Sequence, residues 1–400
     1  MRSRIGMLTA VLSACVLFVS CSKIETEKYN DMEIIIGSTS SEKEQSDPAE
    51  SDETCESAEY TDTETVTTRA QLILSELTLR EKIGQMILAT CPVEGAASQA
   101  SEYDLGGYLL FAYHFRDETP ESVRMMIGSF QEASDIPMLV AVDEEGGDIV
   151  RLSKFPQYAD EPFGAPMELY SSGGVKAVLD DARAKCSLLA ELGVNMNLAP
   201  VCDIPRSEHD YIYDRTFGTD CNIVCECIEA LIREMNSYGM ISALKHFPGY
   251  GNNLDTHTGI ATDERTLEEF REIDLRPFAS GIDAAAPCIM VSHNIVKCMD
   301  ESLPASLSPE VHRLLREELG FDGVIMTDEL TMGAIREFTG GEDPAVAAVK
   351  AGNDLLCIAD YAEAIDAVEA AVVSGEISEE QINASVLRIL DMKIGYGLIG

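Results

Sequence analysis

Eight short, apolar, β-rich runs recur along the chain, and segments of helical periodicity fill the intervals between them. The runs are Met86–Ala89, Gly107–Phe111, Met138–Asp143, Met196–Pro200, Ile241–His246, Cys288–His293, Gly323–Asp328 and Leu355–Ile358. Eight β/α repeats within about 330 residues predict an α/β fold, a single (β/α)8 barrel of the TIM type. A doubly wound open sheet is the alternative, but no glycine-rich phosphate-binding loop follows the first run.

The amino terminus is typical of an export signal. Basic residues precede the apolar run Leu8–Val19, which is too short to span a bilayer. The run ends in Phe18–Cys21, which resembles the lipobox of bacterial lipoproteins, whereas modification at Cys15 would leave too short an apolar core. We therefore expect residues 1–21 to contain a lipoprotein signal peptide, with a lipid anchor at Cys21 on the outer face of the bacterial cell membrane. An ordinary secretory signal with an incidental cysteine is the alternative.

Residues 22–67 differ in composition from the rest of the chain. Fourteen acidic side chains lie between Glu25 and Glu64 among serines and threonines. Such a segment cannot bury enough apolar surface to fold, so it is expected to be a disordered tether. The regular pattern begins after it, and we assign residues 68–400 to one catalytic domain.

The charge and the cysteines narrow the function. With 29 basic and 70 acidic residues the formal charge is −41, which disfavours nucleic acid as a partner. Most of the 12 cysteines lie in apolar contexts, so we expect buried thiols rather than a disulfide framework. Cys221, Cys225 and Cys227 share one helical pattern, but that pattern places Cys227 on a different face from the other two. We therefore predict neither a metal site nor a cofactor.

Polar residues stand at the carboxyl ends of several predicted strands. They are Asp143, Asn197, Lys245, His246, His293, Asn294, Thr327 and Asp328. In a barrel of parallel strands these ends share one mouth, where polar side chains converge on a ligand. Capping of the following helix is the alternative for any single residue.

Three residues have the chemistry of a glycosidase. Asp328 ends the run GVIMTD, where a carboxylate can attack an anomeric carbon and form a covalent glycosyl intermediate. Strand alternation predicts that the neighbouring Glu329 points the other way. Asp255 and His257 follow the strand Ile241–His246 on a glycine-rich loop, where the pair can serve as one general acid and base. The same pair would supply only half of a metal site.

The span from about Leu77 to Gly397 resembles family 3 glycoside hydrolases, in the single-domain β-N-acetylglucosaminidase branch of peptidoglycan turnover. The matching stretches are LREKIGQMIL, AVDEEGGDIVRL, NLAPVCDI with DRTFGTD, KHFPGYG with DTH, IMVSHN and GVIMTDELTM. KHFPG followed by the Asp-x-His loop is the mark of the acetamido-sugar branch.

This resemblance implies roles for individual residues. Asp328 becomes the nucleophile, and His257 with Asp255 becomes the acid/base dyad. The residues that hold the sugar become Asp143, Arg151, Arg215, Lys245 and His246. The implied function is a retaining, exo-acting hydrolase that releases terminal β-linked N-acetylglucosamine and acts as a monomer on an amino-sugar glycan.

The chain departs from the family pattern at three places. Glu144 and Asp148 stand where the family usually has Gln and Arg, and they add negative charge near the mouth. Three residues rather than four separate Gly251 from Asp255, and Tyr250 replaces a common His. The remaining alternatives are a β-glucosidase, a phosphorylase of the same fold, and a glycan-binding lipoprotein without turnover.

Overall fold

The computed structural model describes residues 63–253, 261–330, 335, 338–339 and 341–400. Residues 60–400 form one compact unit. The predicted signal peptide, and all of the predicted tether before residue 63, lie outside the described residues, as do Asp255 and His257.

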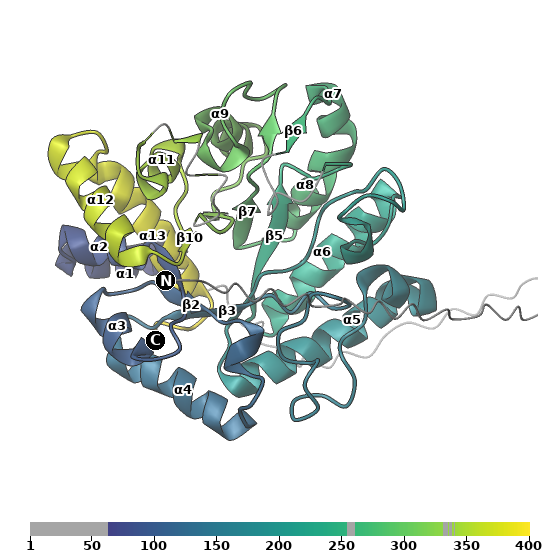
Figure 1. Ribbon diagram of the computed structural model, residues 1–400, viewed down its shortest axis with the longest axis horizontal. Coiled ribbons are helices and arrows are strands. Elements are labelled where there is room, and N and C mark those ends of the chain that lie inside the picture. The colour runs from purple at the N-terminus through teal and green to yellow at the C-terminus, as the bar shows by residue number, and fades with distance from the viewer. Residues whose placement is uncertain (1–62, 254–260, 331–334, 336–337, 340) are drawn as a thin grey trace, which may run out of the picture. The chain divides into compact units, whose positions relative to one another are not determined.

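Eight parallel strands form the centre of this unit (Figure 1). They are β1 (Ile87–Thr90), β2 (Gly107–Leu109), β3 (Leu139–Val142), β4 (Met196–Asn197), β5 (Ile241–Phe247), β7 (Cys288–Val291), β9 (Val324–Thr327) and β10 (Leu356–Ile358). Their order in the sheet is β10-β1-β2-β3-β4-β5-β7-β9. A further parallel bridge, from Met326 to Leu355, brings β9 beside β10 and nearly closes the barrel. The predicted (β/α)8 fold and all eight strands are therefore confirmed.

Helices surround the strands (Figure 1). They are α1 (Thr63–Glu76), α2 (Leu79–Gln85), α3 (Ala96–Glu102), α4 (Pro120–Ala133), α5 (Pro166–Leu192), α6 (Cys221–Ser237), α7 (Leu267–Glu269), α8 (Leu275–Asp283), α9 (Pro309–Arg313), α11 (Pro344–Ala351), α12 (Tyr361–Ser374) and α13 (Glu379–Gly395). The small strands β6 (Thr262–Asp263) and β8 (Ile295–Val296) pair outside the barrel. Thr78 caps α2 and forms a reciprocal capping box with Glu81. This cap marks the turn between α1 and α2.

Burial explains why the strands are apolar throughout rather than alternating. Every residue of β3, β5, β7 and β9 is buried, because helices cover the outside of the barrel while side chains fill its inside. Among the described residues, no helix is both long and apolar enough to cross a lipid bilayer.

The described cysteines are free thiols, as expected, and those in the apolar runs and helices, Cys186, Cys202, Cys288 and Cys357, are buried. On α6, the Sγ atoms of Cys221 and Cys225 lie 3.9 Å apart, whereas Cys227 is fully buried among apolar side chains. The prediction that the helix separates Cys227 from the other two is confirmed.

Candidate active site

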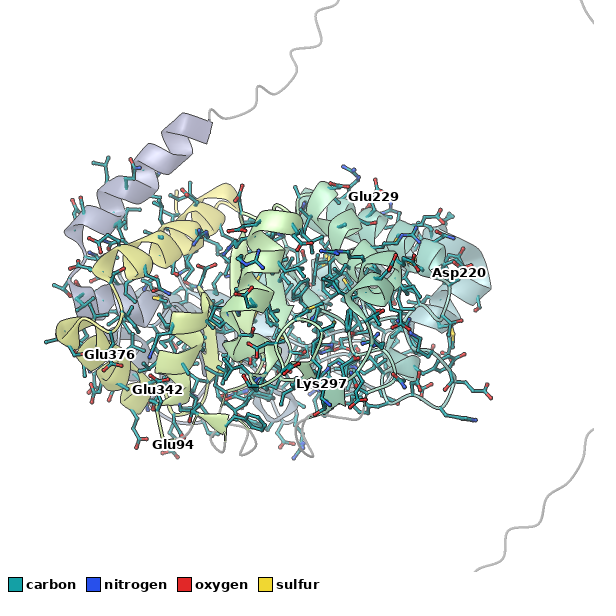
Figure 2. All side chains as sticks on the ribbon, turned by 90° about the horizontal axis from the view of Figure 1, so that it is seen from above. Glu94, Asp220, Glu229, Lys297, Glu342 and Glu376 are labelled. Carbon is teal, nitrogen blue, oxygen red and sulfur yellow. The ribbon has the colours of Figure 1, made fainter. Side chains whose placement is uncertain are left out.

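A cavity of about 430 Å³ opens where the barrel strands end. Eight residues were predicted from the sequence to be catalytic or to hold the sugar, and six of them line this cavity: Asp143, Arg151, Arg215, Lys245, His246 and Asp328. The loops that follow the strands gather on this side of the barrel. In Figure 2, Glu94 and Glu342, which follow β1 and β9, lie in the lower part of the view, whereas α1 (purple) lies at the upper left.

Lys245, near the end of β5, lies between two carboxylates. Its Nζ is 2.8 Å from Asp143 Oδ1 and 2.7 Å from Glu145 Oε1, and the residue is only 2% exposed. Burial by itself lowers the pKa of Lys245. The two carboxylates raise this pKa by more than burial lowers it, so it lies above its ordinary value. Burial raises the pKa of Asp143, but Lys245 and Arg151 lower it below its ordinary value. Lys245 and Asp143 are therefore both charged at neutral pH.

Arg215 donates two hydrogen bonds to the carboxylate of Glu145. Its Nε and Nη2 donate to Glu145 at 2.9 and 2.7 Å. Burial raises the pKa of Glu145, but Lys245 and Arg215 together hold it far below its ordinary value. We had not assigned Glu145 to the site. The sequence offered one signal, which is that Glu145 stands two residues after Asp143 on the segment that follows β3.

His246 is oriented by Asp203, a residue that sequence reasoning missed. The Nδ1 atom of His246 lies 2.7 Å from Asp203 Oδ2, and Asp203 also accepts the backbone N–H groups of His246 and Tyr250. Arg215 Nη2 lies 3.2 Å from Nε2 of the same ring. A guanidinium can only donate, so Nε2 accepts, and the ring proton sits on Nδ1 and points at Asp203.

Arg151 reaches the cavity from the segment after β3. Its Nη2 is 3.1 Å from Asp143 Oδ2. Glu144 holds this segment in place, because its buried carboxylate accepts the backbone N–H groups of Arg151, Leu152 and Ser153. Glu144 itself is fully buried and does not line the cavity, because its carboxylate points at these backbone donors.

Asp328 and Glu329 both line the cavity. We had expected them to point in opposite directions, which would hold only if both belonged to the strand. Strand β9 ends at Thr327, and the chain turns there: the Glu329 N–H donates to Asp328 Oδ1 at 2.8 Å. Glu329 in turn accepts a hydrogen bond from the backbone N–H of Ala359 at 3.2 Å.

The other polar strand ends do not line the cavity, which corrects the expectation that all would converge there. The side chains of Asn197, Thr327 and His293 bond to other parts of the chain instead. Asn197 bonds both backbone groups of Glu144, and the Thr327 hydroxyl accepts the N–H of Cys357. His293 Nδ1 lies 2.7 Å from Ser306 Oγ. Asn294 is fully buried.

The predicted dyad, Asp255 and His257, lies outside the described residues, but contacts link the residues on its two sides. Asn253 donates to Asp263 at 2.6 Å, and Arg265 bonds both Asp263 and the carbonyl oxygen of Gly249. Within the described ranges, no three His, Cys, Asp or Glu side chains are grouped so as to hold a metal ion.

Comparisons with known proteins agree with this geometry. Residues 78–392 match the family model described as "Glycosyl hydrolase family 3 N terminal domain". A β-hexosaminidase of Stenotrophomonas maltophilia is 33% identical over 323 residues, which cover 77% of this chain and 90% of that protein. β-Hexosaminidase A of Pseudoalteromonas piscicida is 29% identical over 76% of this chain, but the match spans only 56% of that longer protein. Among solved structures, a family 3 β-N-acetylglucosaminidase from Paenibacillus sp. has a TM-score of 0.75 and 32% identity, over 81% of this chain and 64% of that one.

Proposed function

The chain belongs to glycosyl hydrolase family 3, and on that premise we propose that it is a retaining, exo-acting β-N-acetylglucosaminidase. The observation that carries the proposal is the single cavity in which Asp328 faces a buried set of charged hydrogen-bonding groups. The similar proteins named β-hexosaminidase and β-N-acetylglucosaminidase support the sugar.

Asp328 is the proposed nucleophile. Its carboxylate attacks the anomeric carbon as the bond to the leaving oxygen breaks, and a glycosyl-aspartate forms. Water then attacks the same carbon and releases the sugar with net retention. The support is positional, since Asp328 directly follows the buried strand β9 and lines the cavity.

The proposed sugar-holding residues are Asp143, Arg151, Arg215, Lys245 and His246. Their ion pairs fix the charged groups before the substrate arrives, so little reorganisation is needed as the transition state forms. Lys and Arg can donate to sugar hydroxyls, while Asp143 can accept from them. We add Glu145 to this set, because it joins Lys245 to Arg215.

The proposed acid and base is His257, oriented by Asp255. The imidazole would donate a proton to the leaving oxygen and later remove one from the attacking water. We further propose that the protein is exported, anchored by a lipid at Cys21, and held away from the membrane by the part of residues 22–67 that precedes α1, which begins at Thr63. Its substrates would be peptidoglycan or chitin-type fragments, and it would act as a monomer.

Release of chromophore from aryl β-N-acetylglucosaminide and aryl β-glucoside, each with and without phosphate, tests the proposal. We expect turnover of the first substrate only, with free N-acetylglucosamine as the product at both phosphate levels. Preference for the glucoside, or a sugar phosphate as product, would instead identify a β-glucosidase or a phosphorylase.

Asp328→Asn provides the mechanistic half of the test. The amide keeps the shape of the side chain but cannot form the covalent intermediate. We expect less than about a hundredth of the wild-type rate, a loss of more than ~3 kcal/mol in transition-state stabilisation. A variant that stays folded and retains more than that would exclude Asp328 as the nucleophile.

A further inference from the structure

Lys185 on α5 is a buried lysine that the proposed chemistry does not use. The residue is only 9% exposed, and its Nζ lies 3.1 Å from Asp181 Oδ2, one turn earlier on the same helix. Both side chains of this ion pair are largely removed from solvent. A buried ion pair is often no more stable than apolar side chains in the same space, so stability by itself does not explain this lysine.

The Nζ atom of Lys185 also reaches the segment that carries Glu145. It donates a hydrogen bond of 2.7 Å to the backbone carbonyl oxygen of Glu145. The carboxylate of the same residue lies 2.7 Å from Lys245 Nζ and accepts two hydrogen bonds from Arg215. Lys185 therefore holds the backbone of the residue that joins two of the proposed sugar-holding cations.

The turn that follows Glu145 has little to hold it by packing. Its first two residues, Gly146 and Gly147, have φ angles of +111° and +59°, which glycine adopts without strain. A Cβ atom on Gly146 would lie 2.2 Å from the carbonyl oxygen of Gly164, so no larger residue fits there. Because neither glycine has a side chain, the position of the turn depends on hydrogen bonds from neighbouring segments.

The Asp181–Lys185 pair connects this turn to the loop before α5. Asp181 Oδ1 accepts the backbone N–H of Gly164 at 3.3 Å. The carbonyl oxygen of Phe163 accepts the N–H of Gly147 at 2.9 Å, and Lys185 Nζ lies 5.3 Å from the centroid of the Phe163 ring. One pair of side chains on α5 thus holds both segments in register.

A small cavity of about 40 Å³ lies beside these contacts. Glu145, Asp181 and Lys185 line it together with apolar side chains of α5 and α6, such as Val178 and Leu231. Close-packed neighbours would keep a segment in place even without a hydrogen bond. Because the cavity leaves room next to Glu145, this residue can shift when Lys185 no longer holds it.

We propose that Lys185 is a positioning residue that acts through Glu145 on the groups that hold the sugar. Lys185 does not line the cavity that contains Asp328, so it does not touch a substrate bound there. It keeps the Glu145 carboxylate where Lys245 and Arg215 both reach it. This inference rests on the proposed function and adds to it a residue outside the cavity. A purely structural role would instead lower the free energy of unfolding and leave sugar binding unchanged.

Lys185→Met tests the proposal, because it keeps most of the side-chain length but removes the charge and the hydrogen bond. We expect kcat/KM on aryl β-N-acetylglucosaminide to fall by about ten- to hundredfold, with KM raised at least about threefold. Lys185→Arg keeps a charged donor and should retain more of the wild-type kcat/KM. Lys393→Met is the matched control, since Lys393 is also a buried lysine, donates to Gln85 and does not line the cavity. It should stay within about twofold of the wild type.

A second variant controls for stability, because Lys185→Met leaves Asp181 buried without its cation. The double variant Lys185→Met/Asp181→Asn removes both charges, so no unpaired charge remains, and it should show the same rise in KM. An unchanged KM in the double variant, with or without a lower kcat, would overturn the proposal. Equal losses in Lys185→Arg and Lys185→Met would also overturn it, because the charged donor would then have no part in the effect.

Crystal structures of the two methionine variants separate this proposal from the proposed function. We expect the Glu145 carboxylate to lose its contact with Lys245 or Arg215, whichever sugar the protein cleaves. Glu145 found in its wild-type place would overturn the role of Lys185 even if the proposed function is correct. A wild type that prefers aryl β-glucoside would overturn the proposed function, and the same comparison of variants on that substrate would still test Lys185.

Discussion

Lys393 on α13 should make the protein less stable as the pH falls. The residue is fully buried, and its Nζ donates to Gln85 Oε1 at 2.8 Å. Within the described part of the chain, no acidic side chain forms an ion pair with it. Burial lowers the pKa of Lys393 from 10.5 to about 7. The folded protein therefore holds this amine largely neutral at mildly alkaline pH, whereas the unfolded chain holds it protonated.

The sign and the size of the effect follow from this difference in pKa. Between about pH 7 and 10.5 the unfolded state binds one more proton than the folded state, so the free energy of unfolding falls as the pH falls through this window. Each pH unit is worth about 1.36 kcal/mol, and the full window about 5 kcal/mol, as an order of magnitude. Lys393→Met removes this dependence at the cost of one hydrogen bond to Gln85, about 1 kcal/mol at every pH.

Urea unfolding of the wild type and of Lys393→Met at pH 7.5 and pH 9 measures the effect. The stability of the variant relative to the wild type should increase by about 2 kcal/mol between pH 9 and pH 7.5. Lys176→Met is the control, since the Lys176 side chain is 83% exposed on α5, where its amine forms a surface ion pair with Asp180. A difference between Lys393→Met and the wild type that is the same at both pH values would refute the reasoning, because it would mean that Lys393 remains protonated in the folded protein.

Three further predictions concern the active site. Glu145→Gln leaves the buried Lys245 and Arg215 with half of their countercharge, so we expect the free energy of unfolding to fall by about 3–5 kcal/mol and kcat/KM to decrease. Urea unfolding measures the first effect and steady-state kinetics the second. A variant equal to the wild type in both would exclude Glu145 from the network. Asp203→Asn removes the carboxylate that orients His246, so kcat/KM should fall by about 10- to 100-fold. Asp203→Glu keeps a carboxylate and should retain part of the wild-type kcat/KM. No loss in Asp203→Asn would show that the imidazole ring is held by other contacts. His257→Ala should lower the rate on glycosides with poor leaving groups by about 10²–10⁴-fold more than on aryl glycosides, and equal losses on both would show that His257 is not the acid.

The architecture was predictable from the sequence because each strand carries its own signal. A strand buried on both faces is apolar along most of its length, so eight such runs between helical segments were sufficient to predict the barrel. The capping box of Thr78 and Glu81 is equally local, since it joins residues three apart.

Part of the site was also predictable. The carboxyl ends of parallel strands share one face, so Asp143, Lys245, His246 and Asp328 had to lie near one another once the barrel was inferred. Arg151 and Arg215 came from the family resemblance, and both line the cavity. The assignment of Asp255 and His257 stays a prediction.

What only the tertiary structure decided is which polar groups meet. Asp203 reaches His246 across 43 positions of sequence, and Glu145 reaches Arg215 across 70, and no periodicity encodes such pairs. Asn197, His293 and Thr327 look like cavity residues in the sequence, but Asn197 and Thr327 bond to neighbouring strands, and His293 bonds to Ser306. Sequence patterns report the burial of each residue separately, whereas a pair of buried polar groups depends on the packing of two distant segments.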